Sequence, residues 1–125
     1  VVIAQGREPR EWLEVAHRLE QSAQRVRAER WGPRTLDVDV ISCRQDADDT
    51  AVASEILSED VELTLPHPRA HERAFVLVPW LALDPEAALT VEGRLRPVAE
   101  LVAGLSEAER AGVRRVDGTL TGPAA

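Results

Sequence analysis

The stretch that decides how this chain is organised reads Arg30-Trp31-Gly32-Pro33-Arg34-Thr35-Leu36-Asp37-Val38-Asp39-Val40. It joins an arginine-bearing loop, interrupted by a Gly-Pro breaker, to a segment whose β-branched residues predict a strand at residues 36–42. Side chains at positions i and i+2 of a strand point to the same face. Asp37 and Asp39 are therefore expected to project together, while the apolar residues beside them, Leu36, Val38 and Val40, face the core.

Two carboxylates on one strand face predict a divalent metal site. Mg²⁺ prefers oxygen ligands in octahedral geometry and commonly takes one or two protein carboxylates together with waters and substrate phosphates. Metal ions held by Asp37 and Asp39 would neutralise a polyphosphate during an in-line displacement. The alternative is a solvated strand face with two ordinary acids, since an Asp-x-Asp pair alone is a short motif.

Four arginines just upstream of this pair indicate an anionic ligand. Arg25, Arg27, Arg30 and Arg34 carry guanidinium groups, which suit bidentate contacts with phosphate. Phosphoryl transfer depends mostly on positioning and charge neutralisation, so arginines and a carboxylate-held metal are sufficient for it. The alternative is a basic helix end favoured by the helix dipole, which explains Arg25 and Arg27 but not Arg34.

Length and charge restrict the class of protein. The chain has 125 residues and a formal net charge of −7, which fits one modest domain and argues against a nucleic-acid or anionic-membrane binder. We expect this domain at residues 1–117 and a flexible tail at 118–125. The single cysteine, Cys43, excludes an internal disulfide and a cysteine-rich zinc site. No apolar stretch is long enough to span a membrane, so a cytoplasmic protein is expected. We also expect a monomer.

Apolar periodicity and turn signals predict strands and helices in mixed order. Apolar residues between positions 11 and 27 recur at spacings of three and four, which predicts an amphipathic helix with Pro9 near its start. Residues 44–60 are expected to form an acidic surface loop. Short strands are expected at 1–4, 61–65, 75–78 and 113–116, a hairpin at 89–95, and helices at 79–83 and 97–105. This mixture indicates an α+β or α/β class.

Two other side chains are candidates for ligand contact. His67 lies between Pro66 and Pro68, which favour extended backbone, and we expect it to hydrogen-bond a phosphate or ribose. A structural turn histidine is the alternative, and zinc is disfavoured because His17 lies far upstream. Trp31 in the Gly-Pro loop either closes over a ligand or packs on the core.

Two stretches together resemble the 6-hydroxymethyl-7,8-dihydropterin pyrophosphokinase family. The first is Arg25-Val26-Arg27 followed by residues 30–39, and the second is Leu63-Thr64-Leu65-Pro66-His67-Pro68 with His71, Arg73, Phe75-Val76-Leu77 and Pro79. The resemblance covers residues 1–105. It implies an α+β, ferredoxin-like sandwich with a mainly antiparallel sheet. It also implies transfer of pyrophosphate from ATP to the pterin's hydroxymethyl group, with release of AMP, in folate biosynthesis.

The resemblance further implies roles for single residues. Asp37 and Asp39 would hold two Mg²⁺ ions, and Arg25 and Arg34 would act on the phosphates as catalytic residues. The ring of Phe75 would stack on the pterin. The residues expected to contact ATP are Glu20, Arg27, Trp31, Thr64, His67 and Arg73.

The start of the chain departs from the family pattern. Family members are expected to begin about fifty residues earlier, as suits a single domain of ordinary size, and the sequence contains no methionine. The N-terminal βαβ portion, with part of the pterin pocket, is therefore expected to be missing. Two alternatives to the enzyme follow: a non-catalytic remnant or interaction module, and another Asp-x-Asp nucleotide-using transferase.

Overall fold

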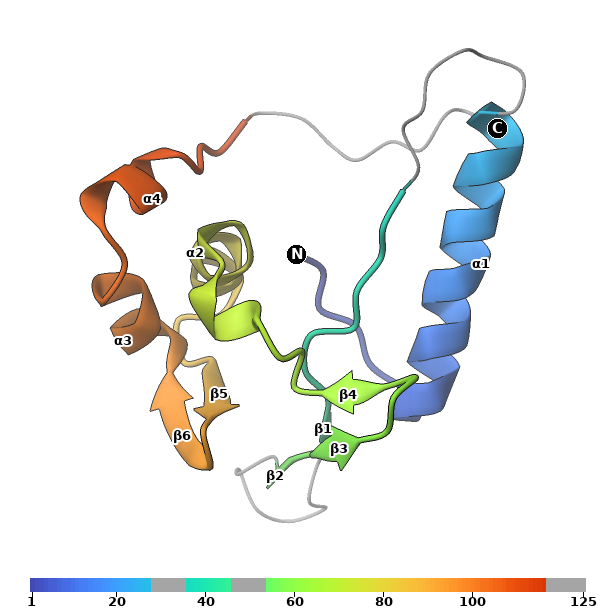
Figure 1. Ribbon diagram of the computed structural model, residues 1–125, viewed down its shortest axis with the longest axis horizontal. Coiled ribbons are helices and arrows are strands. Elements are labelled where there is room, and N and C mark those ends of the chain that lie inside the picture. Colours follow the sequence, from blue (N-terminus) through green and yellow to red (C-terminus); the bar gives the residue numbers. More distant parts are fainter. Residues whose placement is uncertain (28–35, 46–53, 117–125) are drawn as a thin grey trace.

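The structure is a computed structural model, and it describes residues 1–27, 36–45 and 54–116 of the chain (Figure 1). The elements, in chain order, are the helix α1 (Pro9–Arg27), the strands β1 (Arg44–Gln45), β2 (Ser54–Glu55), β3 (Ser58–Glu59) and β4 (Thr64–Leu65), the 3₁₀ turn η1 (Ala70–Glu72), the helix α2 (Ala74–Leu83), the strands β5 (Ala88–Val91) and β6 (Arg94–Pro97), and the helices α3 (Val98–Ala103) and α4 (Glu107–Ala111). The α+β class predicted from the sequence is confirmed.

The helix α1 confirms the prediction from apolar spacing, with Pro9 as its first residue. Its start is stabilised from within, because the Glu11 carboxylate accepts a hydrogen bond from the backbone N–H of Glu8 at 3.0 Å. An acidic side chain in the first turn also interacts favourably with the helix dipole. Of the apolar face, Ala16 is buried and Leu19 remains 49% exposed. The helix therefore lies at one side of the molecule (Figure 1).

The strands described by the structure form three separate antiparallel pairs, β1–β2, β3–β4 and β5–β6. The pair β5–β6 is the hairpin predicted at residues 89–95. Its two-residue turn, Glu92-Gly93, has positive φ at both positions, 51° and 79°. This geometry matches the twist of the flanking strands, so the turn itself sets the register in which Val91 pairs with Arg94.

The core lies between α2, α3 and the β5–β6 hairpin. Leu77, Leu89 and Val98 are at most 1% exposed, and Trp80 packs with them. The predicted strand at residues 75–78 is wrong, because these residues belong to α2. A short apolar run fits a buried strand and a buried helix equally well by periodicity. The helix buries Val76, Leu77 and Trp80 on one side, a spacing that a strand does not provide.

Three other predicted strands are also wrong. Residues 1–4, 36–42 and 113–116 have no strand pairing among the described residues. Val1, Val2 and Ile3 are each about half exposed or more, at 49%, 77% and 56%. β-branched residues favour extended backbone, but a strand also needs a hydrogen-bonded neighbour to form. The predicted helix at 97–105 is confirmed as α3. Residues 46–53 of the acidic 44–60 stretch, and residues 117–125, lie outside the described residues, and the described part of that stretch contains the short strands β1, β2 and β3 where a loop was expected.

Candidate functional site

The two aspartates of the candidate metal site lie on an extended segment, residues 36–43, that leads into β1 (Figure 1). Asp37 and Asp39 are exposed, and Val38 and Val40 are half-buried. This alternation is what a shared face for the two carboxylates requires. Leu36 was expected to face the core, but its side chain is 46% exposed. The pair is thus presented to solvent by an extended segment rather than by a paired strand.

Glu20 connects this segment to α1. Its Oε2 accepts a hydrogen bond from the backbone N–H of Val38 at 3.0 Å, and the contact is partly buried. Val38 lies between the two aspartates, so the bond fixes the backbone that carries both. The resemblance implies that Glu20 contacts ATP, whereas the contact in this structure is with the aspartate segment.

Asp37 and Asp39 could supply two of the ligands of a magnesium ion. Within residues 1–27, 36–45 and 54–116, no three His, Cys, Asp or Glu side chains are grouped as a complete protein ligand set. Mg²⁺ does not need such a set, since one or two carboxylates with waters and substrate phosphates are sufficient. Asp37 and Asp39 meet that lower requirement, with the phosphates of a nucleotide as the remaining ligands.

His67 joins the same segment from the other side. Its backbone N–H donates to the carbonyl of Ile41 at 2.8 Å. Its Nδ1 accepts from the backbone N–H of Arg69 at 3.2 Å, which assigns the ring proton to Nε2. The Nε2–H is then a hydrogen-bond donor of the kind that a phosphate or ribose oxygen accepts.

Thr64, Arg73 and Phe75 follow along the chain. Thr64 is exposed in β4, and its hydroxyl donates to the carbonyl of Asp60 at 3.0 Å. The Arg73 guanidinium lies 5.6 Å from the centre of the Phe75 ring, within the range of a cation–π contact. Phe75 is 62% exposed. Arg73, one of the residues predicted to contact ATP, and Phe75, predicted to contact the pterin, are therefore direct neighbours at the start of α2.

The remaining predicted residues are not placed by the structure. Trp31 and Arg34 lie in 28–35, outside the described residues, and Arg25 and Arg27 end α1 with side chains that are not described. A separate hollow of about 430 Å³ is lined by Arg94, Leu95, Arg96 and Glu100. It contains none of the predicted site residues, so the candidate site is defined by the aspartate segment and its two hydrogen-bonded neighbours.

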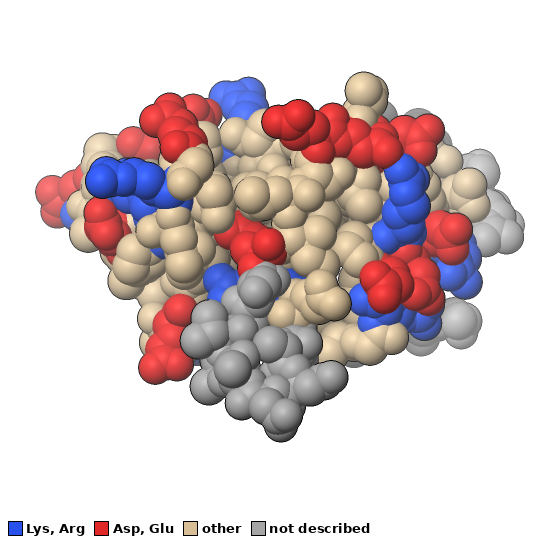
Figure 2. All heavy atoms as spheres, turned by 90° about the horizontal axis from the view of Figure 1, so that it is seen from below, with Lys and Arg blue, Asp and Glu red and all other residues tan. Residues whose placement is uncertain are grey.

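The aspartate segment is exposed at Asp37 and Asp39 and half-buried at Cys43. At its end, burial raises the pKa of the Cys43 thiol above its ordinary value. Figure 2 shows acidic and basic side chains interspersed along the margins of one face of the molecule. On that face acidic and basic side chains lie near one another.

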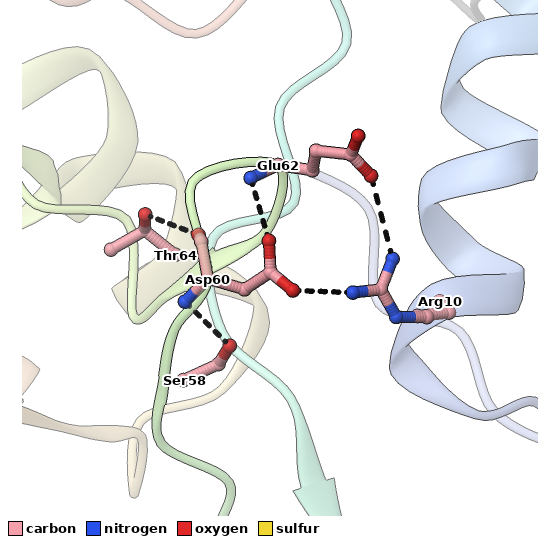
Figure 3. A network of polar contacts seen from close by, with 5 residues as sticks. All are labelled: Arg10, Ser58, Asp60, Glu62 and Thr64. Carbon is pink, nitrogen blue, oxygen red and sulfur yellow. Dashed lines mark hydrogen bonds and ion pairs between the residues drawn. The ribbon is translucent and has the colours of Figure 1, made fainter.

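Sequence reasoning missed the role of Asp60 and Arg10. Asp60 begins a turn, and its Oδ1 accepts from the backbone N–H of Glu62 at 2.9 Å, so the Asp itself was a usable turn signal, since Asp side chains commonly bond the backbone N–H two residues on. Arg10 pairs with Asp60 across 50 positions of sequence (Figure 3). No local pattern predicts such a long-range pair.

Comparison with known proteins identifies a family. The family model for 7,8-dihydro-6-hydroxymethylpterin-pyrophosphokinase matches residues 1–85. A 2-amino-4-hydroxy-6-hydroxymethyldihydropteridine pyrophosphokinase of Mycobacterium tuberculosis (strain ATCC 25618 / H37Rv) is 55% identical over 107 residues, which are 86% of this chain and 56% of that protein. The protein of the same name from Mycobacterium leprae is 56% identical over 105 residues, 84% of this chain and 55% of its own length.

A more distant relative is the bifunctional protein FolKE of Lactococcus lactis, 38% identical over 103 residues, which are 82% of this chain and 26% of that protein. The chain spans about half the length of the mycobacterial relatives that it matches. Among the described residues, none of the helices is long and apolar enough to cross a membrane.

Proposed function

Because this chain belongs to the 7,8-dihydro-6-hydroxymethylpterin-pyrophosphokinase family, we propose that it takes part in an ATP-dependent pyrophosphoryl transfer in folate biosynthesis. The acceptor is the hydroxymethyl group of 6-hydroxymethyl-7,8-dihydropterin. The observation that carries the proposal is that the family match includes the whole aspartate segment, together with Glu20 and His67, which bond to it.

The reaction follows from the groups exchanged. The hydroxyl oxygen of the pterin forms a bond to the β-phosphorus of ATP, and the bond between that phosphorus and the oxygen bridging to the α-phosphate breaks. AMP leaves with that oxygen, and the hydroxyl proton passes to solvent. Bound Mg²⁺ ions would supply charge neutralisation on the phosphates, with Asp37 and Asp39 as their protein ligands.

The other residues serve binding and orientation in this proposal. Glu20 holds the backbone between the aspartates, and the Nε2–H of His67 donates to a phosphate or ribose oxygen. Arg73 contacts ATP beside Phe75, whose ring stacks on the pterin through the face that the guanidinium leaves free. Arg25 and Arg34 act on the phosphates, and Arg27, Trp31 and Thr64 contact ATP. We further propose that the protein works as a cytoplasmic monomer without a nucleic-acid or membrane partner.

Removal of either acidic ligand tests the proposal. In the full chain, Asp37→Asn or Asp39→Asn should lower kcat for AMP formation at least about a hundredfold, since losing one group that stabilises transition-state charge costs on the order of 10²–10³ in rate. Circular dichroism should be unchanged, because both side chains are exposed. Glu86→Gln, which alters an exposed acid elsewhere, is the matched control and should retain full activity.

The same measurements separate the alternatives. Magnesium-dependent AMP formation at the normal rate in either variant would contradict the metal assignment. A thermal shift with a nucleotide sugar but none with ATP would favour a different Asp-x-Asp transferase. No response to any nucleotide, in a folded protein, would favour a non-catalytic module.

A further inference from the structure

A polar network joins the first turn of α1 to the loop between β3 and β4 (Figure 3). Nη2 of Arg10 lies 2.5 Å from Oδ2 of Asp60, and Nη1 lies 3.6 Å from Oε2 of Glu62. One guanidinium group thus faces two carboxylates of the same loop. A planar fork in contact with two acids holds a more defined geometry than a single point contact.

Asp60 organises the loop that Arg10 contacts. Its Oδ1 accepts from the backbone N–H of Glu62 at 2.9 Å, and its carbonyl accepts from the backbone N–H of Leu63 at 3.1 Å. The same carbonyl accepts from the hydroxyl of Thr64 at 3.0 Å. One oxygen of the Asp60 carboxylate therefore binds the loop backbone, and the other binds Arg10.

These contacts couple Arg10 to Thr64. The ion pair with Arg10 restrains the Asp60 side chain, and the Oδ1 atom of that side chain restrains the loop backbone. The same backbone includes the Asp60 carbonyl, which accepts the hydrogen bond from the Thr64 hydroxyl. Thr64 opens β4, and the same short stretch of chain leads to His67, which bonds to the aspartate segment. A displacement of the loop would therefore be transmitted toward Thr64 and His67, two of the side chains that the proposed function places on ATP.

We propose that Arg10 is a positioning residue for ATP binding, acting through Asp60 on the Thr64 end of the site. The inference rests on the proposed function, since Thr64 and His67 are ATP contacts only within it. The Arg10 and Asp60 side chains are 61% and 42% exposed, so the effect is modest and screened by salt. It acts on the affinity for ATP and leaves the chemical step unchanged, because neither residue touches a reacting atom.

Conservative variants remove the ion pair while keeping the hydrogen bonds within the loop. Asp60→Asn retains Oδ1 as the acceptor for Glu62 but removes the charge that Arg10 binds, and Arg10→Gln removes the guanidinium. Each change should raise KM for ATP about two- to fivefold at low ionic strength, as expected for one exposed pair, with kcat unchanged. The double variant should raise KM no further than the larger single effect, because both changes remove the same interaction. Glu62→Gln, which alters only the 3.6 Å contact, should have the smallest effect.

Salt provides a second measurement that general destabilisation does not reproduce. The difference in KM for ATP between the unmodified chain and Arg10→Gln should disappear near 1 M salt, where the screening length is about 3 Å. Unchanged KM in Arg10→Gln and Asp60→Asn, or additive effects in the double variant, would overturn the inference. An unmodified chain without ATP-dependent transfer would instead contradict the proposed function, so the two failures are distinguishable.

Discussion

At the scale of single residues, Glu20 makes a contact that the sequence did not predict. The resemblance implies an ATP contact, but the carboxylate accepts the Val38 N–H between the two aspartates. A hydrogen bond to a charged acceptor contributes on the order of 1.5–3 kcal/mol. Glu20 therefore has enough influence to set the backbone geometry of the candidate metal site.

Two substitutions at Glu20 test this role. Glu20→Gln keeps an oxygen acceptor for the backbone N–H of Val38, whereas Glu20→Ala removes that acceptor. Glu20→Ala should raise the Mg²⁺ concentration for half-maximal activity about tenfold at saturating ATP, in line with the loss of a charged hydrogen bond. Glu20→Gln should stay within about threefold of the unmodified chain, since a neutral acceptor retains part of the bond.

The measurement is a Mg²⁺ activation curve taken alongside KM for ATP. If Glu20→Ala raises only KM for ATP and leaves the Mg²⁺ curve unchanged, the direct ATP contact implied by the resemblance is correct. If both variants behave alike, the negative charge matters rather than the bond to Val38.

At the scale of elements, side chains rather than backbone hydrogen bonds join the β1–β2 pair to β5. The β1–β2 pair is only two residues long in each strand, yet it is fixed to the edge of β5 by two side chains. Oε1 of Glu55 accepts from the N–H and the hydroxyl of Thr90, at 2.9 and 2.5 Å, and Arg44 donates to the carbonyl of Ala88. These contacts satisfy alternate backbone groups of an otherwise open edge, which also protects it from unwanted pairing.

The Glu55 contact should make a measurable contribution to stability. Glu55→Ala leaves two donors of Thr90 without this acceptor and should lower the free energy of unfolding by about 1–3 kcal/mol. Thr90→Val removes only the hydroxyl and should cost about 1 kcal/mol. Urea denaturation of both singles and the double variant measures the coupling, and fully additive losses would show that Glu55 and Thr90 do not act as a pair.

At the scale of the whole molecule, the core and the aspartate segment lie in different elements, although Arg73 and Phe75 lie at the start of the core helix α2. The core is built from η1, α2, β5 and α3, whereas Asp37, Asp39 and Glu20 lie on α1 and the segment beside it. The link between the two regions includes the bond from His67 to Ile41, whose side chain packs against the core. Stability and site chemistry should therefore respond to different substitutions.

A core substitution tests this separation. Leu77 is fully buried, so Leu77→Ala should lower the free energy of unfolding by about 2–5 kcal/mol through lost contacts and a residual cavity. Below the transition, ATP binding by the folded fraction should remain close to that of the unmodified chain. Calorimetric unfolding and ATP titration at one temperature give both quantities, and a loss of affinity in fully folded protein would show that the core shapes the site.

The sequence by itself determined the features that depend on neighbours along the chain. The spacing of apolar residues identified α1, the Glu92-Gly93 pair identified the β5–β6 hairpin, and the two motifs around residues 25–39 and 63–79 identified the family. Alternation along an extended segment was enough to place Asp37 and Asp39 on one side. Each of these is a local property, fixed by backbone geometry within a few residues.

Tertiary structure decided the features that depend on a partner far away in sequence. Strands were predicted at 75–78 and at 36–42, but the first lies in the helix α2 and the second is unpaired among the described residues, because helices satisfy their own backbone hydrogen bonds and strands need a neighbour. The contacts of Glu20 with Val38, Arg10 with Asp60 and Glu55 with Thr90 join positions 18, 50 and 35 apart. No local pattern encodes such pairs, since they exist only once packing has brought the segments together.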